Sequence, residues 1–151
     1  PAVWFDNWRK CVEALDVAVP ILIENTAGGS NAMARYVENI DRLWAAISTA
    51  SGFEHVGFCL DTCHAHAAGV QLPGLTDRIR AITGRIDLVH VNDSRDAAGS
   101  GADRHANLGK GQADPEFIMQ VIRDAAAPVI IETPGGVADH IADLDWIRTR
   151  L

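Results

Sequence analysis

Alternation of short apolar runs with helical segments is the feature of this sequence that most restricts its fold. Four runs are rich in branched apolar residues and too short for helices: VPILIEN (19–25), HVGFCLD (55–61), RIDLVHVND (85–93) and PVIIETP (128–134). Continuous apolar runs of this length are typical of strands that are buried on both faces of a parallel sheet. Parallel strands need a crossover connection, usually a helix. The pattern therefore predicts an α/β fold with four consecutive parallel strands.

The segments around these runs have the three- and four-residue apolar spacing of amphipathic helices. In residues 31–47 this spacing gives one apolar stripe, and Ser30 or Asn31 can cap its start. Asp114 followed by Pro115 is a strong helix start signal. The segment at the C-terminus is also amphipathic by this criterion. The predicted helices cover residues 3–15, 31–47, 75–83, 114–125 and 138–151.

Four strand–helix units follow one another with no linker or low-complexity tract, which predicts a single domain over residues 1–151. A (β/α)8 barrel typically has about 250 residues, so four units correspond to half of one. Because the first residue is proline rather than methionine, we expect a partial TIM barrel: the C-terminal part of a barrel whose N-terminal half is missing. A small open doubly wound sheet is the alternative.

Composition and charge narrow the class of protein. The chain has 151 residues, 48% of them hydrophobic, which is enough for a core. Its apolar runs are shorter than the roughly 18 to 20 residues of a membrane span, and no signal segment opens the chain, so we expect a soluble, cytoplasmic protein. Cys11, Cys59 and Cys63 form no even disulfide set and are expected to be buried thiols. A net charge of −7 argues against binding nucleic acid by positive charge alone.

Acidic and imidazole residues stand at the carboxyl end of each predicted strand. The first strand ends in Glu24, and the second ends in Asp61 with His64 close behind. The third strand carries His90 and the fourth Glu132. Parallel α/β sheets bind their ligands at this edge, and carboxylates and imidazoles are ligands that zinc accepts. Taken singly, each acidic residue can be a helix cap, but their coincidence at equivalent positions favours a shared metal site.

The glycine-studded loop behind the third strand adds Asp103 and His105 to this set. Seven ligands are too many for one tetrahedral zinc ion, so two or three metals with a bridging carboxylate are expected. His66 is left outside the ligand set, although it follows His64 by two residues. The histidines expected to be solvated are His55 and His140.

Bound metal ions would offset the negative net charge that argues against a nucleic-acid substrate. Three divalent ions would bring the formal charge from −7 to about −1 and concentrate positive charge in one cleft. A phosphate diester would be attracted there without a basic surface. Arg95, Arg104 and Lys110 are available for flanking phosphates, although a solvated face is the simpler account of them.

Four motifs carry a family resemblance: IENTAG (23–28), GFCLDTCH (57–64), HVNDSRDAAGSGADRH (90–105) and IIETP (130–134). Together they resemble the endonuclease IV family of zinc-dependent apurinic/apyrimidinic endonucleases, also called AP endonuclease family 2, over nearly the whole chain. The resemblance implies a xylose-isomerase-like barrel with three zinc ions, Mn²⁺ being an alternative at one site. It also implies hydrolysis of the DNA phosphodiester 5′ to abasic sites in base excision repair.

The resemblance also assigns roles to the candidate residues. Glu24 matches the carboxylate that bridges two zinc ions, and Glu24 or Glu132 would orient the attacking water as the catalytic residue. The remaining ligands match in two sets: Asp61, His90 and Glu132 at one zinc, and His64, Asp103 and His105 at the third. The family's two further histidines and its DNA-penetrating loops are expected in the missing N-terminal half. Arg95 replaces the family's usual lysine, and GGS (28–30) replaces a Gly-Gln-Gly turn.

The expected partner is double-stranded DNA with abasic sites, with no membrane association and no obligate protein partner. We expect the 151 residues alone to incise such DNA weakly or not at all. One alternative is a metal-dependent sugar isomerase or epimerase on a related barrel, which leaves Asp103 and His105 unexplained. A second alternative is a chain that keeps most ligands but has no catalytic activity.

Overall fold

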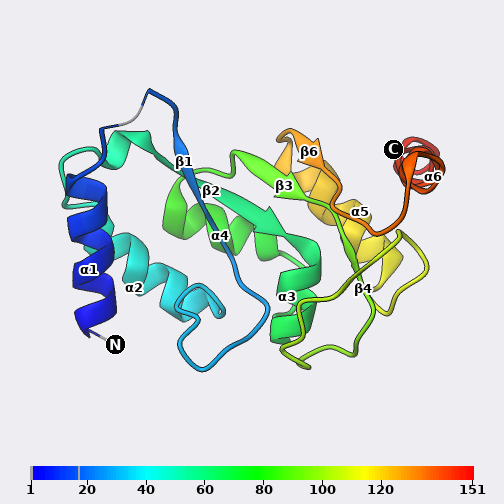
Figure 1. Cartoon of the computed structure of the whole chain (residues 1–151), viewed down its shortest axis with the longest axis horizontal. Helices are drawn as coiled ribbons and strands as arrows, with labels where there is room; N and C mark the ends of the chain where they lie inside the picture. The colour runs from blue at the N-terminus through cyan, green and yellow to red at the C-terminus, as the bar shows by residue number, and fades with distance from the viewer. Residues whose placement is uncertain (1, 17) are drawn as a thin grey trace.

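A computed structural model describes residues 2–16 and 18–151, and its centre is a four-stranded parallel sheet (Figure 1). The strands lie in sequence order, each paired in parallel with the next. They are β1 (Ile21–Glu24), β2 (Val56–Asp61), β3 (Leu88–His90) and β6 (Val129–Ile130). The predicted α/β fold of four consecutive parallel strands is therefore confirmed, and β1 and β6 form the two edges of the sheet.

Helices precede, connect and follow the strands. The connecting helices are α2 (Val37–Ile47), α4 (Leu75–Thr83) and α5 (Pro115–Ala125), while α1 (Ala2–Glu13) and α6 (Val137–Arg148) stand at the two ends. Contacts join α1 to α2, α2 to α4 and α4 to α5, so the helices form a continuous layer beside the sheet (Figure 1). Short elements complete the chain: η1 (Phe53–His55), α3 (Thr62–Ala68), and the antiparallel pair β4 (Asp93–Ser94) and β5 (His105–Ala106).

The hydrophobic core lies between the sheet and the helix layer. All six residues of β2 are buried, as a continuous apolar run predicts for a central strand. Trp44 of α2 makes edge-to-face contacts with Phe53 and Phe58, at ring-centroid distances of 6.0 and 5.8 Å. No helix in the described part of the chain has the length and apolarity that a membrane crossing requires.

Helix α2 begins six residues later than its apolar spacing predicts. Its N-cap residue is Tyr36, which makes no side-chain capping bond, so the predicted caps Ser30 and Asn31 are wrong. The preceding residues form a loop that folds back on the end of β1, where the Thr26 amide donates to the Ala34 carbonyl at 3.1 Å. A Cβ on Gly28 would lie 2.1 Å from the Gly101 carbonyl oxygen. Packing between these two loops, which local periodicity does not report, overrides the helical pattern.

Helix α3 is absent from the predicted helices, although its start signal is strong. The Asp61 carboxylate accepts a hydrogen bond from the His64 amide at 2.7 Å, which caps the helix directly at the end of β2. Gly69, with φ of 79°, ends it two turns later. The predicted cap at the start of α5 is confirmed, since the Asp114 carboxylate accepts from the Glu116 amide at 2.8 Å.

Helix α6 lies where the sequence predicts it, but a continuous apolar stripe does not pack it against the rest of the protein. Ile141 and Leu144 are exposed, whereas Asp143 is buried. The Asp143 carboxylate accepts from the Asn107 side-chain amide at 2.8 Å and from the Leu108 amide at 2.9 Å. It also accepts from the Thr133 hydroxyl at 2.5 Å. A polar anchor therefore holds this helix to the loops beside the sheet.

Asp93 organises the long segment between β3 and α5. Its buried carboxylate accepts four backbone hydrogen bonds: Oδ1 from Ser94 and Ala113 at 2.7 and 3.0 Å, and Oδ2 from Gly109 and Gly111 at 3.1 and 2.9 Å. One side chain thus closes a loop of about twenty residues. The same loop contains β5, which pairs with β4, and this pairing places His105.

We expect Asp93→Asn to lower the free energy of unfolding by about 2 to 3 kcal/mol, because the amide would turn an N–H group towards backbone donors. Urea denaturation measures the change. Asp41→Asn, at an exposed position of α2, is the control and should shift stability by less than about 0.5 kcal/mol. Equal midpoints for the two variants would contradict this account of Asp93.

Candidate metal centre

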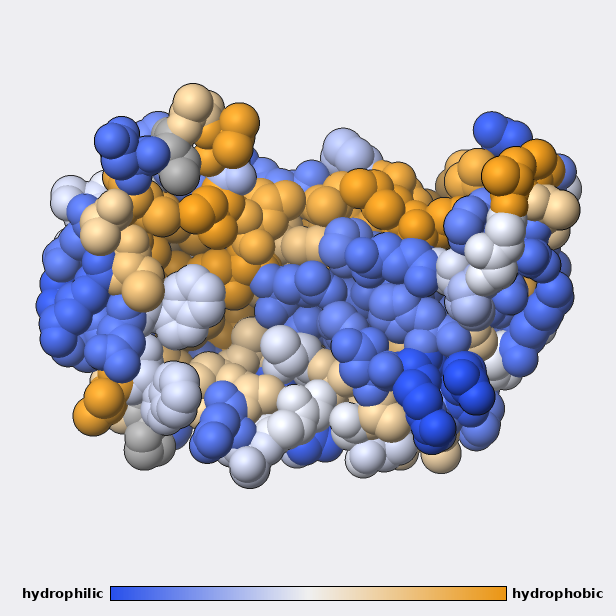
Figure 2. All heavy atoms as spheres, in the orientation of Figure 1, coloured by the Kyte–Doolittle hydropathy of each residue, from blue (hydrophilic) through white to orange (hydrophobic). Residues whose placement is uncertain are grey.

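The in-register pairing of the strands brings their carboxyl ends to one rim. Asp61, the last residue of β2, pairs with His90, the last residue of β3. His90 pairs in turn with Ile130, two residues before Glu132. Glu24 ends β1 on the other side of β2. Figure 2 shows hydrophilic residues gathered around α3 and β4, below an apolar band that runs from β1 to β6.

Glu24 stands between two imidazoles. Its Oε1 lies 3.0 Å from His64 Nδ1 and 3.4 Å from His90 Nδ1. The same nitrogen of His90 is 3.1 Å from Glu132 Oε2. Side chains from β1, α3 and β3 therefore meet around one carboxylate oxygen, and Glu132, just beyond β6, joins them through His90.

A second set of contacts surrounds Asp103, which lies in the loop that Asp93 closes. Its Oδ1 is 3.0 Å from His64 Nε2 and 3.3 Å from His105 Nε2. The rings of these two histidines are 5.6 Å apart between centroids. Asp61 Oδ2 is 3.9 Å from His105 Nε2, so the buried Asp61 carboxylate lies next to both sets.

All seven predicted ligands are thus brought together. Ligand atoms within 4.8 Å of one another define three sets without cysteine: Glu24, Asp61 and His64; Asp61, His90 and Glu132; and His64, Asp103 and His105. Two further sets include a buried thiol, Cys59 or Cys63. Burial and nearby carboxylates raise the pKa of Cys59 to about 12 and that of Cys63 to about 11, which keeps both thiols neutral.

Four of the converging atoms are buried without a hydrogen-bond partner: Glu24 Oε1, His64 Nε2, His90 Nδ1 and His105 Nε2. Such atoms are costly unless something else satisfies them. The opposite ring nitrogen of His64 lies 2.9 Å from the Asn25 carbonyl, and that of His105 lies 3.1 Å from the Glu132 carbonyl. Metal-binding histidines usually donate their second N–H in this way. The donor set therefore fits a metal ion.

Charges in the cluster already act on one another. Burial opposes ionisation of Glu24, but the neighbouring imidazoles of His64 and His90 outweigh it and lower the pKa of Glu24 below its usual value. Burial also opposes the protonated form of His64, yet Glu24, Asp61 and Asp103 raise its pKa to about 10. Burial raises the pKa of Asp61. The protonated His64 is thus the cation that the surrounding carboxylates favour in the absence of metal.

Comparison with known proteins identifies the family. Residues 2–150 match the family model described as a xylose isomerase-like TIM barrel. The chain belongs to this family. This match confirms the prediction of a partial TIM barrel. Relatives named endonuclease 4 and endonuclease IV confirm the resemblance to the endonuclease IV family.

Relatives called probable endonuclease 4, from Mycobacterium ulcerans and Mycobacterium marinum, are 59% identical to this chain over 141 residues. Each match covers 93% of the chain and 54% of the relative. The chain thus spans about half the length of the curated relatives it matches. The crystal structure of endonuclease IV from Thermus thermophilus aligns with a TM-score of 0.70 and 31% identity, over 85% of this chain and 48% of that chain. A probable 3-DHS dehydratase from Bacillus anthracis shares the fold alone, with a TM-score of 0.65 and 16% identity.

Several other side chains lie away from the rim cluster or are already paired. His66 is buried with its Nε2 3.0 Å from the Asp96 carbonyl, and none of the close donor sets among the described residues includes it. His55 is exposed as predicted, but His140 is not simply solvated, because its Nε2 lies 2.9 Å from the Thr133 carbonyl. Arg104 forms an ion pair with Asp96 and is not a free cation.

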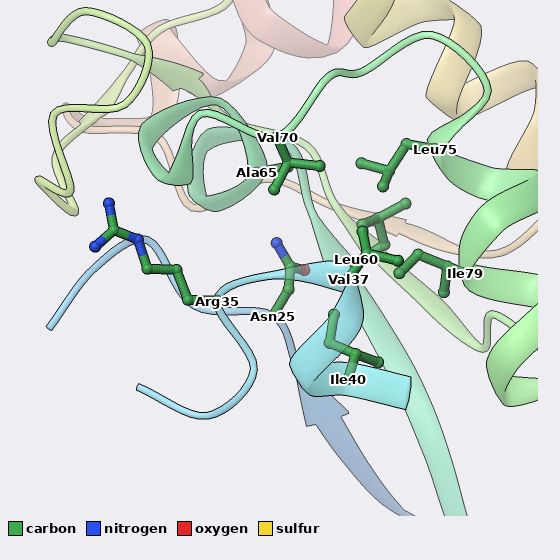
Figure 3. A pocket seen from close by; sticks show the side chains of 9 residues that line it. All are labelled: Asn25, Arg35, Val37, Ile40, Leu60, Ala65, Val70, Leu75 and Ile79. Atoms are coloured by element: carbon green, nitrogen blue, oxygen red, sulfur yellow. The ribbon is translucent and has the colours of Figure 1, made fainter. Parts of the chain in front are cut away.

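Two asparagines, Asn25 and Asn92, belong to the candidate metal centre, although they are not predicted as site residues from the sequence. The Asn25 side chain bonds the backbone of Asp61, accepting from its amide at 2.7 Å and donating to its carbonyl at 3.0 Å. Asn92 donates to Asp61 Oδ2 at 2.8 Å. Their sequence signal is their place one or two residues behind a ligand-bearing strand end. Below the rim, Asn25 borders a cavity of only about 10 Å³, whose other lining is mostly apolar (Figure 3).

We expect the chain to bind two zinc ions, one in the donor set of Asp61, His90 and Glu132 and one in the other set without cysteine that includes His105. Native mass spectrometry counts the ions. His105→Ala should remove one of them, and His55→Ala, at an exposed position before β2, should remove none. A wild-type chain that stays metal-free with excess zinc would contradict the fit of this site.

The cysteines should differ sharply in reactivity. Cys11 is exposed, contrary to the expectation of three buried thiols, whereas Cys59 and Cys63 are buried. Because the pKa values of the two buried thiols are raised to about 12 and 11, their reactive thiolates are scarce at pH 8 and increase only as the pH approaches those values. We expect a disulfide reagent at pH 8 to modify one thiol quickly. Cys11→Ser should abolish this fast phase, and a persisting fast phase would overturn the assignment.

Proposed function

We propose that this chain carries the metal centre of a zinc-dependent endonuclease that hydrolyses the DNA phosphodiester 5′ to abasic sites. The observation that carries the proposal is the convergence of seven carboxylate and imidazole side chains in adjacent sets at one rim of the sheet. Relatives named endonuclease 4 support a nuclease over other enzymes of this barrel family. Since the chain spans about half of those relatives, the proposal concerns the activity of the whole protein.

The residues divide between two metal positions. Asp61, His90 and Glu132 would hold one zinc ion, with Glu24 as a bridging carboxylate. The second set would hold another ion: His64, Asp103 and His105. His64 lies within 3.0 Å of both Glu24 and Asp103, which supports two closely spaced ions rather than two independent sites.

Zinc bound there would supply Lewis-acid stabilisation of the phosphate and would lower the pKa of water. The protein's own contribution is position and proton transfer. Glu132 is 44% exposed at its side chain and contacts His90 through Oε2, so its other carboxylate oxygen would accept a proton from the attacking water. Glu24 is less exposed and flanked by two imidazoles, which suits a bridging ligand better than a base.

The surface near the metal centre limits how DNA can be held. Arg104 is paired with Asp96, which leaves Arg95 and Lys110 as the loop cations without an ion pair among the described residues. With a formal charge of −7, the attraction for phosphate would come chiefly from bound metal. Selectivity for abasic sites would follow from the low cost of extruding a nucleotide that has no base to unstack.

A metal-dependent sugar isomerase or epimerase is less well supported. Such an enzyme would use the strand-end residues Glu24, Asp61, His90 and Glu132 to hold ions that polarise a sugar carbonyl. It gives no role to Asp103 and His105, which form a close donor set with His64. The relatives' names also favour the nuclease.

The test is incision of a duplex that contains one abasic analogue. We expect this chain, fused to the N-terminal part of the M. marinum relative, to cut on the 5′ side of the lesion, and a chelator to abolish the cut. Glu132→Gln should lower the rate by about 100-fold or more, because it removes a proton acceptor and a charged ligand. Glu54→Gln, in the exposed turn before β2, is the matched control.

Incision that is indifferent to the chelator and to Glu132→Gln would refute the proposed function. Conversion of an aldose to a ketose by the same protein, without incision, would favour the isomerase. Incision by the 151 residues alone at the rate of the fusion would refute the separate expectation that this part is weakly active.

A further inference from the structure

One buried amide joins the ends of three strands. Asn92, two residues beyond β3, has no exposed surface, and neither does Asp61 at the end of β2. Asn92 Nδ2 donates to Asp61 Oδ2 at 2.8 Å, and Asn92 Oδ1 accepts from the Glu132 amide at 2.8 Å. The Thr62 hydroxyl donates to the Asn92 carbonyl at 2.7 Å and accepts from its amide at 3.0 Å, which fixes the backbone of Asn92.

The contact with Asp61 selects one carboxylate orientation. Asp61 Oδ1 is already engaged by the His64 amide at the start of α3. The other oxygen, Oδ2, is the one that Asn92 holds and the one that lies 3.9 Å from His105 Nε2. Between them these two bonds fix both carboxylate oxygens, while Oδ2 keeps a lone pair for a cation.

The contact with Glu132 replaces a missing backbone bond. Strand β6 has two residues and pairs with β3 only as far as Ile130, whose carbonyl accepts from the Val91 amide at 2.8 Å. Glu132 comes two residues later, beyond the ladder. The Asn92 side chain supplies the acceptor for its amide and so continues the connection between the two chain segments.

Asn25 is the instructive contrast. Its side chain bonds only the backbone amide and carbonyl of Asp61, in the manner of one more rung between β1 and β2. Asn92 instead contacts the ligand oxygen of one proposed metal-binding residue and the backbone of a second. Both of these residues belong to the donor set of Asp61, His90 and Glu132.

We propose that Asn92 is a positioning residue of the metal centre: it aims Asp61 Oδ2 and sets the place of Glu132, so that this donor set is assembled before metal binds. The inference rests on the proposed function insofar as that function requires zinc at the rim. It predicts a selective loss, because Asn92 makes no hydrogen bond to the side chains of His64, Asp103 or His105. Partners of metal ligands typically contribute 10- to 100-fold in metal affinity.

The test counts zinc ions in two Asn92 variants. Asn92→Asp is isosteric but cannot donate to Asp61 when ionised, and Asn92→Ala removes both bonds. We expect native mass spectrometry to find one zinc per chain instead of two, with the affinity of the lost site reduced 10- to 100-fold in chelator competition. Adding His105→Ala to Asn92→Asp should remove the remaining ion.

Thr83→Val is the matched control. The Thr83 hydroxyl is buried and bonded to the carbonyls of Ile79 and Arg85 at 3.0 and 2.5 Å, at the end of α4 that leads into the start of β3. It should lose stability, measured by thermal unfolding, and keep both zinc ions.

Three outcomes would overturn the proposal. In the first, Asn92→Asp folds and holds both ions with wild-type affinity. In the second, Thr83→Val loses zinc to the same extent. In the third, both Asn92 variants fail to fold while Thr83→Val folds, which would make Asn92 a residue of the core only. A wild-type chain without zinc would instead refute the proposed function, so the two failures are distinguishable.

Discussion

Parallel, in-register pairing of short strands is the constraint on which the rest of this structure depends. Because β1, β2 and β3 run in the same direction, with Asp61 paired to His90 and Glu24 paired to Cys59, two residues before Asp61, their carboxyl ends reach a common rim without any special loop. The helices that connect the strands lie in a layer beside the sheet. The convergence of Glu24, Asp61 and His90 is thus a consequence of sheet geometry, whereas His64, Asp103, His105 and Glu132 need additional structure to join them.

That additional structure is built around buried carboxylates. Asp61 caps α3 and thereby turns His64 towards Glu24. Asp93 gathers four backbone amides and so holds the loop that carries Asp103 and His105. Asp143 ties α6 to the same region. Each carboxylate is satisfied by backbone or side-chain donors, as burial of a polar group requires, and each fixes a segment that has little regular secondary structure.

The proposed metal centre accounts for the electrostatics of the rim. Three carboxylates raise the pKa of His64 to about 10, and four donor atoms are buried without hydrogen-bond partners. Both features indicate an environment that favours additional positive charge. A probable dehydratase shares the same barrel fold, so the particular donor sets and the relatives named endonuclease 4, rather than the fold, support the proposed phosphodiester hydrolysis.

The amino-acid sequence by itself determined the four strands, the helices α2, α4 and α5 between them and the residues at the strand ends, because apolar spacing and the order of segments are properties that a sequence displays. It did not determine the start of α2, the seating of α6 or the roles of Asn25 and Asn92. Those depend on Gly28 meeting Gly101 and on side-chain bonds between segments far apart in the chain. Such contacts have no period, so only the tertiary structure, which brings the segments together, decided them.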